Sequence, residues 1–548
     1  MKKYIIILFS AMMLLGVFSC KKSFLDETPY SAYTPITLTD SLGFEASLTG
    51  LYNHVSTIFT YSDQQGWPSV WQVGTDVANA TANQQAVEIP YYNYALLTPA
   101  DNAASFIWGR YYILVNLSNA IIDNISKSSL STSGKNIIAA EAKFFRAYAY
   151  NNLAILFGGV PLVRHALTGP KTDFVRLPLD SINNFIESDL TFAASNLPDI
   201  ENVRKNSKGK MYERANKYMA MQLLAEAYLR MNKPALAEVQ TQNIITSGKF
   251  SLIKSRYGVK SGSPGDYYSD MFYFGNQRRV QGNTEALWVL EQENTTTVVG
   301  GATNAAQQRR VWGAAYYNIS GMLPCDSLGG RSIGRLRLSN WVIYSLFAKN
   351  DIRNSKYNFH RRFWYNDATQ PAKFGKPVPY TGPDTLFKIC PYITKWGAFD
   401  PNDTFGWVMF KDYILMRLGE TYLLQAEAQF KQTKLQDAAN SINELRKRAF
   451  ANYPAEGQVQ ASDITLNFIL DERARELIGE ENRRETLMRT GTLVDRAMTL
   501  NGNDKVHPTV GLSATHLLLP IPLSEIQLNK DATLEQNPGY KDLIIRLV

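Results

Sequence analysis

The chain has 548 residues, of which 45% are hydrophobic and 19% charged, and its formal net charge is +8. This balance is typical of a globular protein that can bury a core. Its Lys and Arg residues are scattered along the sequence, which argues against a nucleic-acid-binding face.

The first residues are typical of an export signal. Two lysines precede an apolar run over residues 4–17, which is too short to span a bilayer and lies where a signal peptide lies. The run ends in the letters VFSC at residues 17–20, which resemble a lipobox. We therefore expect residues 1–19 to be a signal peptide and Cys20 to carry the lipid. Residues 20–40 hold two prolines, many hydroxyl groups and little periodicity, which predicts a lipidated tether.

Two long helices are predicted next. Residues 101–125 and 135–157 have the length and apolar periodicity of helices. The second ends at Gly158 and Gly159, with Pro161 shortly after, which is a helix stop signal. Its apolar residues occupy nearly all sides, so we expect this helix to be buried on most of its surface.

Two stretches, residues 218–248 and 415–449, are predicted to be helix hairpins. Each has apolar residues three or four apart on both sides of a short turn. In the second hairpin the first apolar stripe begins at Leu415, and small residues recur that let its helices approach closely. This resembles tetratricopeptide-like packing. Because the hairpins lie far apart in the sequence, we do not expect a tandem solenoid.

Between the hairpins, residues 251–404 form a loop-rich region. Gly, Pro, Asn, Tyr, Trp and Arg dominate there, and helical periodicity mostly lapses. Residues 285–291 (EALWVLE) predict one short strand, with Trp288 in the core. A loop region this long is usually functional or disordered, and its many aromatics argue against disorder.

No motif of an enzyme emerges. The chain has no nucleotide-binding glycine loop, no G-x-S-x-G and no H-E-x-x-H, and its five histidines lack metal-ligand spacing. We therefore expect no catalytic residue, no metal and no cofactor. Glu472 and Glu476 suggest paired catalytic carboxylates, but a structural interpretation is favoured. Three carboxylates have arginines three or four residues on, a spacing that makes ion pairs along a helix: Asp471, Glu472 and Glu480, with Arg475, Arg483 and Arg484.

The three cysteines leave one question open. With Cys20 assigned to lipid, Cys325 and Cys390 remain. An exported compartment permits a bridge between them, and two free buried thiols fit the sequence equally well.

Aromatic residues beside polar groups are the positive functional signal. They cluster in residues 61–79, 307–318 and 360–367. A sugar ring offers apolar C–H faces and a rim of hydroxyls, so a sugar binder needs flat side chains and hydrogen-bonding groups. Loop packing explains any single aromatic at least as well. Trp312 and Tyr316 are four apart, so a helical turn would put both on one side. The predicted ligand-binding residues are Trp312, Tyr316, Tyr317, Trp67, Arg310 and Trp364.

Four blocks, in family order, resemble the SusD/RagB family of nutrient-binding lipoproteins. They are AEAKFFRAYAYNNLAILFGGVPLV (140–163), YILMRLGETYLLQAEA (413–428), ILDERARELIGEENRRETLMRTG (469–491) and LLPIPLSEIQLNKDATLEQNPGY (518–540). The FLDETP that follows the lipobox and the LFAKNDIR at 346–353 add to the resemblance.

The resemblance implies a mainly α, SusD-like fold with tetratricopeptide-like helix pairs and a loop-rich variable region with minor β structure. We expect a single domain over residues 41–548, with a helical body at 41–250 and 405–548 and the variable region at 251–404. The family implies a non-enzymatic lipoprotein of the outer membrane, at the cell surface, that serves polysaccharide utilisation. It would capture oligosaccharides and deliver them to a TonB-dependent transporter of the SusC kind.

The nature of the ligand stays open. A peptide-binding relative of the same family is the first alternative, and a surface glycoside hydrolase is the second. The arginines of the aromatic segments would suit acidic peptides or uronic acids as well as neutral sugars: Arg309, Arg310, Arg361 and Arg362.

Overall fold

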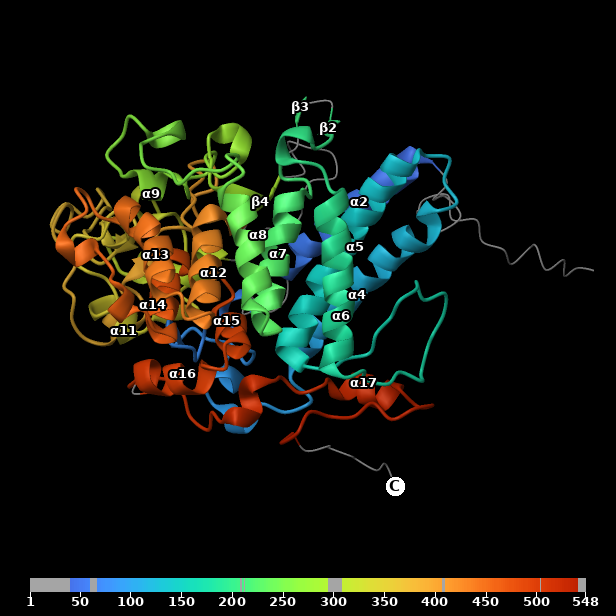
Figure 1. Cartoon of the computed structure of the whole chain (residues 1–548). Helices are drawn as coiled ribbons and strands as arrows, with labels where there is room; N and C mark the ends of the chain where they lie inside the picture. Colours follow the sequence, from blue (N-terminus) through green and yellow to red (C-terminus); the bar gives the residue numbers. More distant parts are fainter. Residues whose placement is uncertain are drawn as a thin grey trace, which may run out of the picture.

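Helices dominate the architecture, as expected from the sequence (Figure 1). The computed structural model describes residues 40–59, 67–206, 209–210, 212–293, 308–406, 410–502 and 504–540. The predicted signal peptide, Cys20 and all but the last residue of the predicted tether lie outside these residues. Within the described ranges, no helix combines the length and the apolar character needed to cross a membrane.

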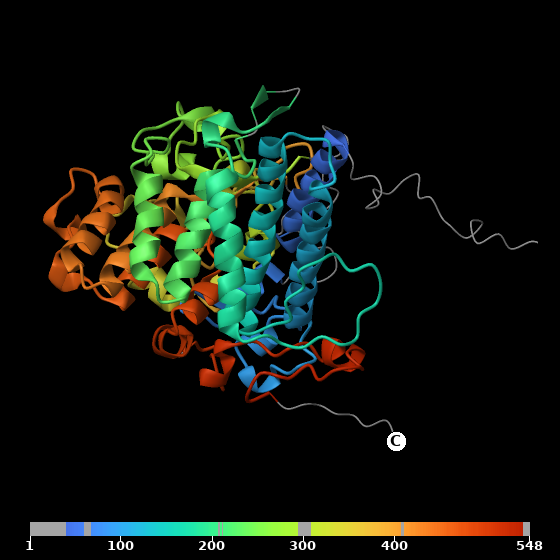
Figure 2. The same cartoon turned by 45° about the vertical axis from the view of Figure 1, so that its right-hand side comes forward.

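The helical body is a row of packed helices. Its members are α2 (Ser41–Phe59), α4 (Asn102–Ile125), α5 (Thr132–Phe157), α6 (Leu179–Asn196), α7 (Lys217–Arg230), α8 (Pro234–Ile245), α12 (Leu418–Lys431) and α13 (Leu435–Ala449). Helix α4 packs on α5, α5 on α6, α6 on α7 and α7 on α8 (Figures 1 and 2). The long central helix α5 is buried on most sides, as predicted.

Local signals set the ends of these helices. The Asp101 side chain accepts a hydrogen bond from the Ala104 N–H and caps α4, and Ser131 caps α5 in the same way through Gly134. Helix α5 ends at Gly158, whose φ of 74° is a left-handed conformation that favours glycine.

Both predicted hairpins are confirmed, as α7–α8 and α12–α13. Although the whole loop-rich region separates them in sequence, α8 packs directly against α12. The row of helices therefore continues from α8 into α12, and the two hairpins are stacked neighbours in space (Figure 1).

A two-stranded ladder pairs a strand inside the loop-rich region with a strand that follows it. Strand β4 (Ala286–Leu290), which was predicted, pairs antiparallel with β8 (Tyr413–Arg417). Leu415 lies in β8 and not on a helix, so the predicted helical stripe begins too early. Trp288 of β4 is fully buried and its ring contacts those of Phe144 and Tyr148 on α5. The ladder therefore fixes the base of the loop-rich region on the body.

The remaining elements are short. The helices are α3 (Trp67–Val70), α9 (Tyr267–Asp270), α10 (Gln308–Trp312), α11 (Asn340–Tyr344), α14 (Leu466–Leu477), α15 (Arg483–Arg489), α16 (Leu493–Asn501) and α17 (Leu523–Leu528). Three further strand pairs are β1 (Ala78–Ala80) with β5 (Leu336–Leu338), β2 (Lys205–Asn206) with β3 (Gly209–Lys210), and β6 (Phe359–His360) with β7 (Tyr392–Ile393). This is the minor β structure that the sequence predicted.

Candidate functional site

A cavity of about 1040 Å³ lies in the loop-rich region. Its wall is built from residues between Lys260 and Phe410, so the helical body holds the site in place without lining it. The volume is at the upper end of the range for small-molecule sites, which makes this cavity the candidate binding site.

One wall is an extended segment that begins in β6. Of residues 359–364, all but Phe363 line the cavity, and Phe363 is buried in a hydrophobic cluster. The backbone of Trp364 is fixed by a bridge to Pro377. The segment therefore contributes two exposed side chains, Arg362 and Trp364, to the cavity wall.

Aromatic side chains supply flat apolar surfaces to this cavity. Phe274 and Trp364 keep 60% and 54% of their surfaces exposed. Tyr273, Tyr357 and Phe399 also line the wall and are half-buried. Hydrogen-bonding groups lie among them: Ser263, Gln292, Ser327, Asn354, Thr394 and Asp400. This mixture of flat faces and polar groups suits a ring that carries hydroxyls.

Several charged groups of the wall are held by the protein itself. Lys260 forms an ion pair with Asp326 at 2.8 Å, and Arg361 donates hydrogen bonds to the carbonyl of Ile343 and the side chain of Asn354. Burial lowers the pKa of His360 to about 4, so its imidazole is neutral at pH 7. A neutral imidazole can still exchange hydrogen bonds with a ligand.

Trp312 and Tyr316 do not lie where the sequence suggested. Helix α10 ends at Trp312, and Tyr316 begins a separate 3-10 turn (Tyr316–Asn318), so no single helix aligns the two rings. Trp312 is 1% exposed in one hydrophobic cluster, and Tyr316 is 0% exposed in another. Stacking needs an accessible ring face, so this geometry does not support either residue as part of a platform.

Tyr317 and Arg310 are also outside the cavity wall, and the Trp67 side chain cannot be placed relative to it. Tyr317 is half-buried, with the Arg331 guanidinium 5.2 Å from its ring centre. Arg310 is buried, and burial together with the nearby Arg331 lowers its pKa to about 9. Trp67 begins α3, and its side chain lies outside the described part of the chain. Binding roles for these residues stay predictions.

Among the predicted binding residues whose side chains are described, Trp364 lines the cavity. The sequence analysis did not single out Tyr273 and Phe274, which also line it. A signal was present, because Gly275 and Asn276 follow these two aromatics directly and give them the same mixed composition as the chosen segments.

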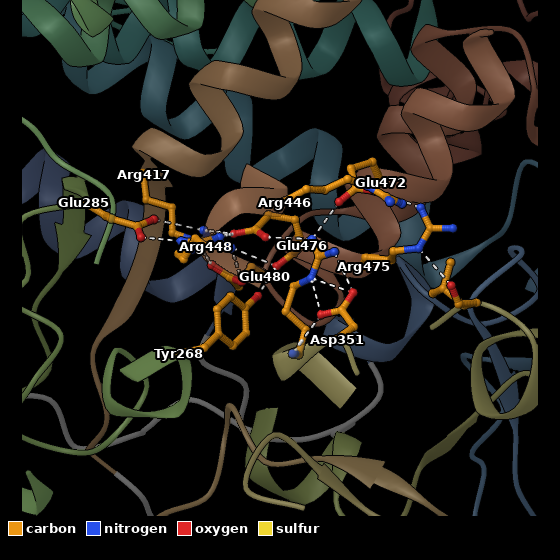
Figure 3. Close-up of polar contacts among 12 residues, drawn as sticks. Tyr268, Glu285, Asp351, Arg417, Arg446, Arg448, Glu472, Arg475, Glu476 and Glu480 are labelled. Carbon is orange, nitrogen blue, oxygen red and sulfur yellow. Dashed lines mark hydrogen bonds and ion pairs between the residues drawn. The ribbon is translucent and has the colours of Figure 1, made fainter. Parts of the chain in front are cut away.

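The suspected catalytic carboxylates, Glu472 and Glu476, form a buried ion-pair network instead (Figure 3). Each accepts hydrogen bonds from several arginines: Arg353, Arg446 and Arg475 for Glu472, and Arg353, Arg417 and Arg448 for Glu476. Burial alone would raise the pKa of each carboxyl, but the arginines outweigh it and hold each pKa well below its usual range. Such groups stay ionised and are poor proton donors.

The structural interpretation of these charges is therefore right, but most of the predicted pairs are wrong. Glu472 does pair with Arg475, as predicted. The other carboxylates and arginines pair between elements: Asp471 with Arg496, Glu480 with Arg417 and Lys395, Arg483 with Asp76 and Glu481, and Arg484 with backbone carbonyls and Tyr94. Helix α14 ends at Leu477, so residues 480–484 do not continue its turns.

The two described cysteines, Cys325 and Cys390, are both free thiols, so they are not bridged. The expectation that both are buried holds for Cys390 alone, because Cys325 is half-buried. Burial raises the pKa of Cys390 to about 12, which leaves it an unreactive thiol at neutral pH. Among the described residues, no group of three or more His, Cys, Asp or Glu side chains is placed to hold a metal ion.

The sequence is similar to family models and to known proteins. A model of the SusD family matches residues 342–540, and a model described as starch-binding and associating with the outer membrane matches residues 23–229. SusD-like protein P25 of Formosa agariphila is 25% identical over 566 residues, covering 98% of both chains. The starch-binding protein SusD of Bacteroides thetaiotaomicron is 35% identical over 130 residues, or 24% of this chain.

Solved structures share the fold. A laminarin-binding SusD-like protein superposes with a TM-score of 0.68 at 20% identity, over 92% of this chain and 100% of that one. Surface glycan-binding protein A from Bacteroides thetaiotaomicron, in complex with laminarihexaose, gives 0.69 at 18% identity, over 91% and 99%. At this level of identity the likeness establishes the fold alone.

Proposed function

We propose that this chain, which belongs to the SusD/RagB family, captures oligosaccharides in the cavity of its loop-rich region. Members of the family are binding proteins without catalytic activity. The relatives named for starch and laminarin bind glycans, which supports a glycan here as well.

The observation that carries the proposal is the exposed aromatic surface inside the cavity. Trp364 and Phe274 would stack on the apolar faces of sugar rings, and the polar groups between them would pair the hydroxyls. Their exposure in the unliganded protein leaves apolar area to be buried when a ligand enters. A site of this kind binds its ligand without changing it.

The experiment is a binding panel read by isothermal titration calorimetry. Hexasaccharides of several polysaccharides are titrated into the protein, with acidic and neutral hexapeptides as the alternative class. We expect at least one glycan to bind and its mass spectrum to be unchanged after incubation. Binding of peptides only would replace the glycan proposal, and shortened glycan products would indicate a hydrolase.

We further propose that the protein is anchored in the outer membrane through Cys20 and works at the cell surface with a SusC-like TonB-dependent transporter. The support is the lipobox-like VFSC at residues 17–20 and the outer-membrane association in the description of the matching model. Replacing Cys20→Ala should release the protein from the membrane fraction, because several acyl chains are needed for stable anchoring. A variant that stays in that fraction would contradict the anchor.

The partnership with a transporter has a separate test. Purification of the wild type in mild detergent should recover a large barrel protein.

A further inference from the structure

Two cations line the cavity beside its aromatic surface. Arg362 lies two residues before Trp364 in the cavity wall, and Lys356 lies a few residues before β6. Both side chains are exposed. Along an extended chain, residues two apart are about 6.6 Å apart. Arg362 is therefore within reach of a substituent on a ring that stacks on Trp364.

Neither cation has an acidic partner among the residues that the structure describes. Within the described ranges, no carboxylate oxygen lies within 4.0 Å of the Lys356 ammonium or the Arg362 guanidinium. Instead, Lys356 lies 5.1 Å from the ring centre of Tyr357, and Arg362 lies 5.5 Å from that of Tyr380. A cation over an aromatic ring keeps its hydrogen-bond donors available for a ligand.

The carboxylates of the wall are already engaged. Asp326 is paired with Lys260, and Glu293 is paired with Arg278, which lies outside the wall. Asp400 accepts a hydrogen bond from the Asn402 N–H. The wall thus carries more positive than negative groups, and its low-dielectric surface concentrates that field inside the cavity.

From this arrangement we infer that the oligosaccharide is anionic, with rings that bear a carboxylate or a sulfate ester. The inference rests on the proposed glycan-binding function. A ring stacks on Trp364 while Arg362 pairs with its anionic group, and Lys356 pairs with a second anionic group along the chain. The planar guanidinium suits both oxyanions, because its parallel N–H groups donate to two oxygens at once.

The test is calorimetry on the full chain with matched hexasaccharides. The probes are hexagalacturonate for carboxylates, a sulfated galactan hexasaccharide for sulfate esters, and laminarihexaose and maltohexaose as neutral controls. We expect one anionic probe to bind at least about tenfold more tightly than either neutral probe. Its affinity should fall as NaCl rises from 50 to 500 mM, because salt screens the ion pairs. Whichever anionic probe binds identifies the oxyanion.

Substitutions test whether Arg362 and Lys356 bind the anionic groups. Arg362→Gln and Lys356→Gln should each weaken the anionic probe by roughly three- to tenfold with unchanged thermal stability. Arg362→Lys should retain part of the affinity, and Lys530→Gln, an exposed lysine outside the wall, should retain all of it. Tight binding of a neutral probe without preference for charge would overturn this inference and leave the glycan proposal standing. Binding of no glycan at all would overturn both.

Discussion

Arg417, the last residue of β8, donates a hydrogen bond of 2.5 Å to the Glu476 carboxylate of α14, and both side chains are fully buried. The same carboxylate accepts from Arg353, which belongs to the loop-rich region, and from Arg448 at the end of α13. One glutamate thus joins the strand ladder, the second hairpin and the cavity-bearing region.

Replacing Glu476→Gln should lower the free energy of unfolding by about 3–5 kcal/mol, because it leaves buried arginines without their counter-charge. Urea denaturation followed by circular dichroism measures the change. Glu444→Gln is the matched control, since Glu444 is partly exposed and paired with Lys447 on the surface, and it should change stability by less than about 0.5 kcal/mol. Equal effects of the two substitutions would contradict the role assigned to the network.

Lys411 should make stability depend on pH in the basic range. Its ammonium donates to the carbonyls of Lys395 and Gly397, and burial lowers its pKa to about 7, whereas an unfolded lysine has a pKa of about 10.4. Between these values the unfolded chain binds more protons, so the free energy of unfolding should rise as pH increases from 7 to 9.5.

The variant Lys411→Met should show a smaller rise, because one titrating group is gone. Part of the rise should remain, since burial also lowers the pKa of Lys395, to about 8. Unfolding curves at half-unit pH steps measure both slopes, and Lys530→Met serves as the exposed-lysine control. Identical slopes in the wild type and in Lys411→Met would show that Lys411 does not titrate in this range.

Trp364→Ala should weaken glycan binding by about 2 kcal/mol, or roughly thirtyfold, because the ring is the stacking surface of the cavity wall. Calorimetry with the best-binding hexasaccharide measures the loss, and the thermal midpoint should not change. Phe374→Ala is the control, because Phe374 is 52% exposed but does not line the cavity. If both variants bind as the wild type does, the stacking surface lies elsewhere, with Phe274 the next residue to test.

Trp312→Ala should act on stability rather than on the ligand. Removing this buried ring should lower the free energy of unfolding by about 3–5 kcal/mol. Affinity measured below the unfolding transition should change less than it does in Trp364→Ala. A variant that loses binding while keeping wild-type stability would restore Trp312 to the binding platform.

The sequence predicted the helices and hairpins well, because their periodicity and caps are local signals. It could not predict that α8 packs against α12, since that contact depends on how the chain between them folds back. The sequence predicts a helix at Leu415 because the spacing between Leu415 and Leu418 fits a helix. The same spacing also fits a strand that runs directly into a helix, which is what the structure shows. Local spacing cannot decide between these two structures.

The candidate site could likewise be predicted only in part from local sequence. Trp312 and Trp364 both stand among aromatics and arginines in the sequence, yet one is buried and the other lines the cavity. Local composition cannot tell the two residues apart, because a ring that packs a loop and a ring that binds a sugar have similar neighbours in the sequence. The difference comes from tertiary packing, because Trp312 is enclosed in a hydrophobic cluster built from distant segments of the chain, whereas Trp364 keeps half of its surface exposed in the cavity wall.

The β4–β8 ladder places Leu290 opposite Tyr413, so the chain leaves the body and returns to it at nearly the same point. Lengthening the segment between these two strands costs little free energy, because each doubling of a flexible loop adds only about 0.6 kcal/mol of closure entropy. This segment could therefore be exchanged between chains that share the body, and it would carry part of the cavity wall with it, whereas the wall residues between Lys260 and Phe274 precede β4 and would stay with the recipient. An exchanged segment would have to keep Arg353 and Lys395, because both reach from it into the network around Glu476. A grafted region without them would leave that glutamate short of partners and loosen the body that received it.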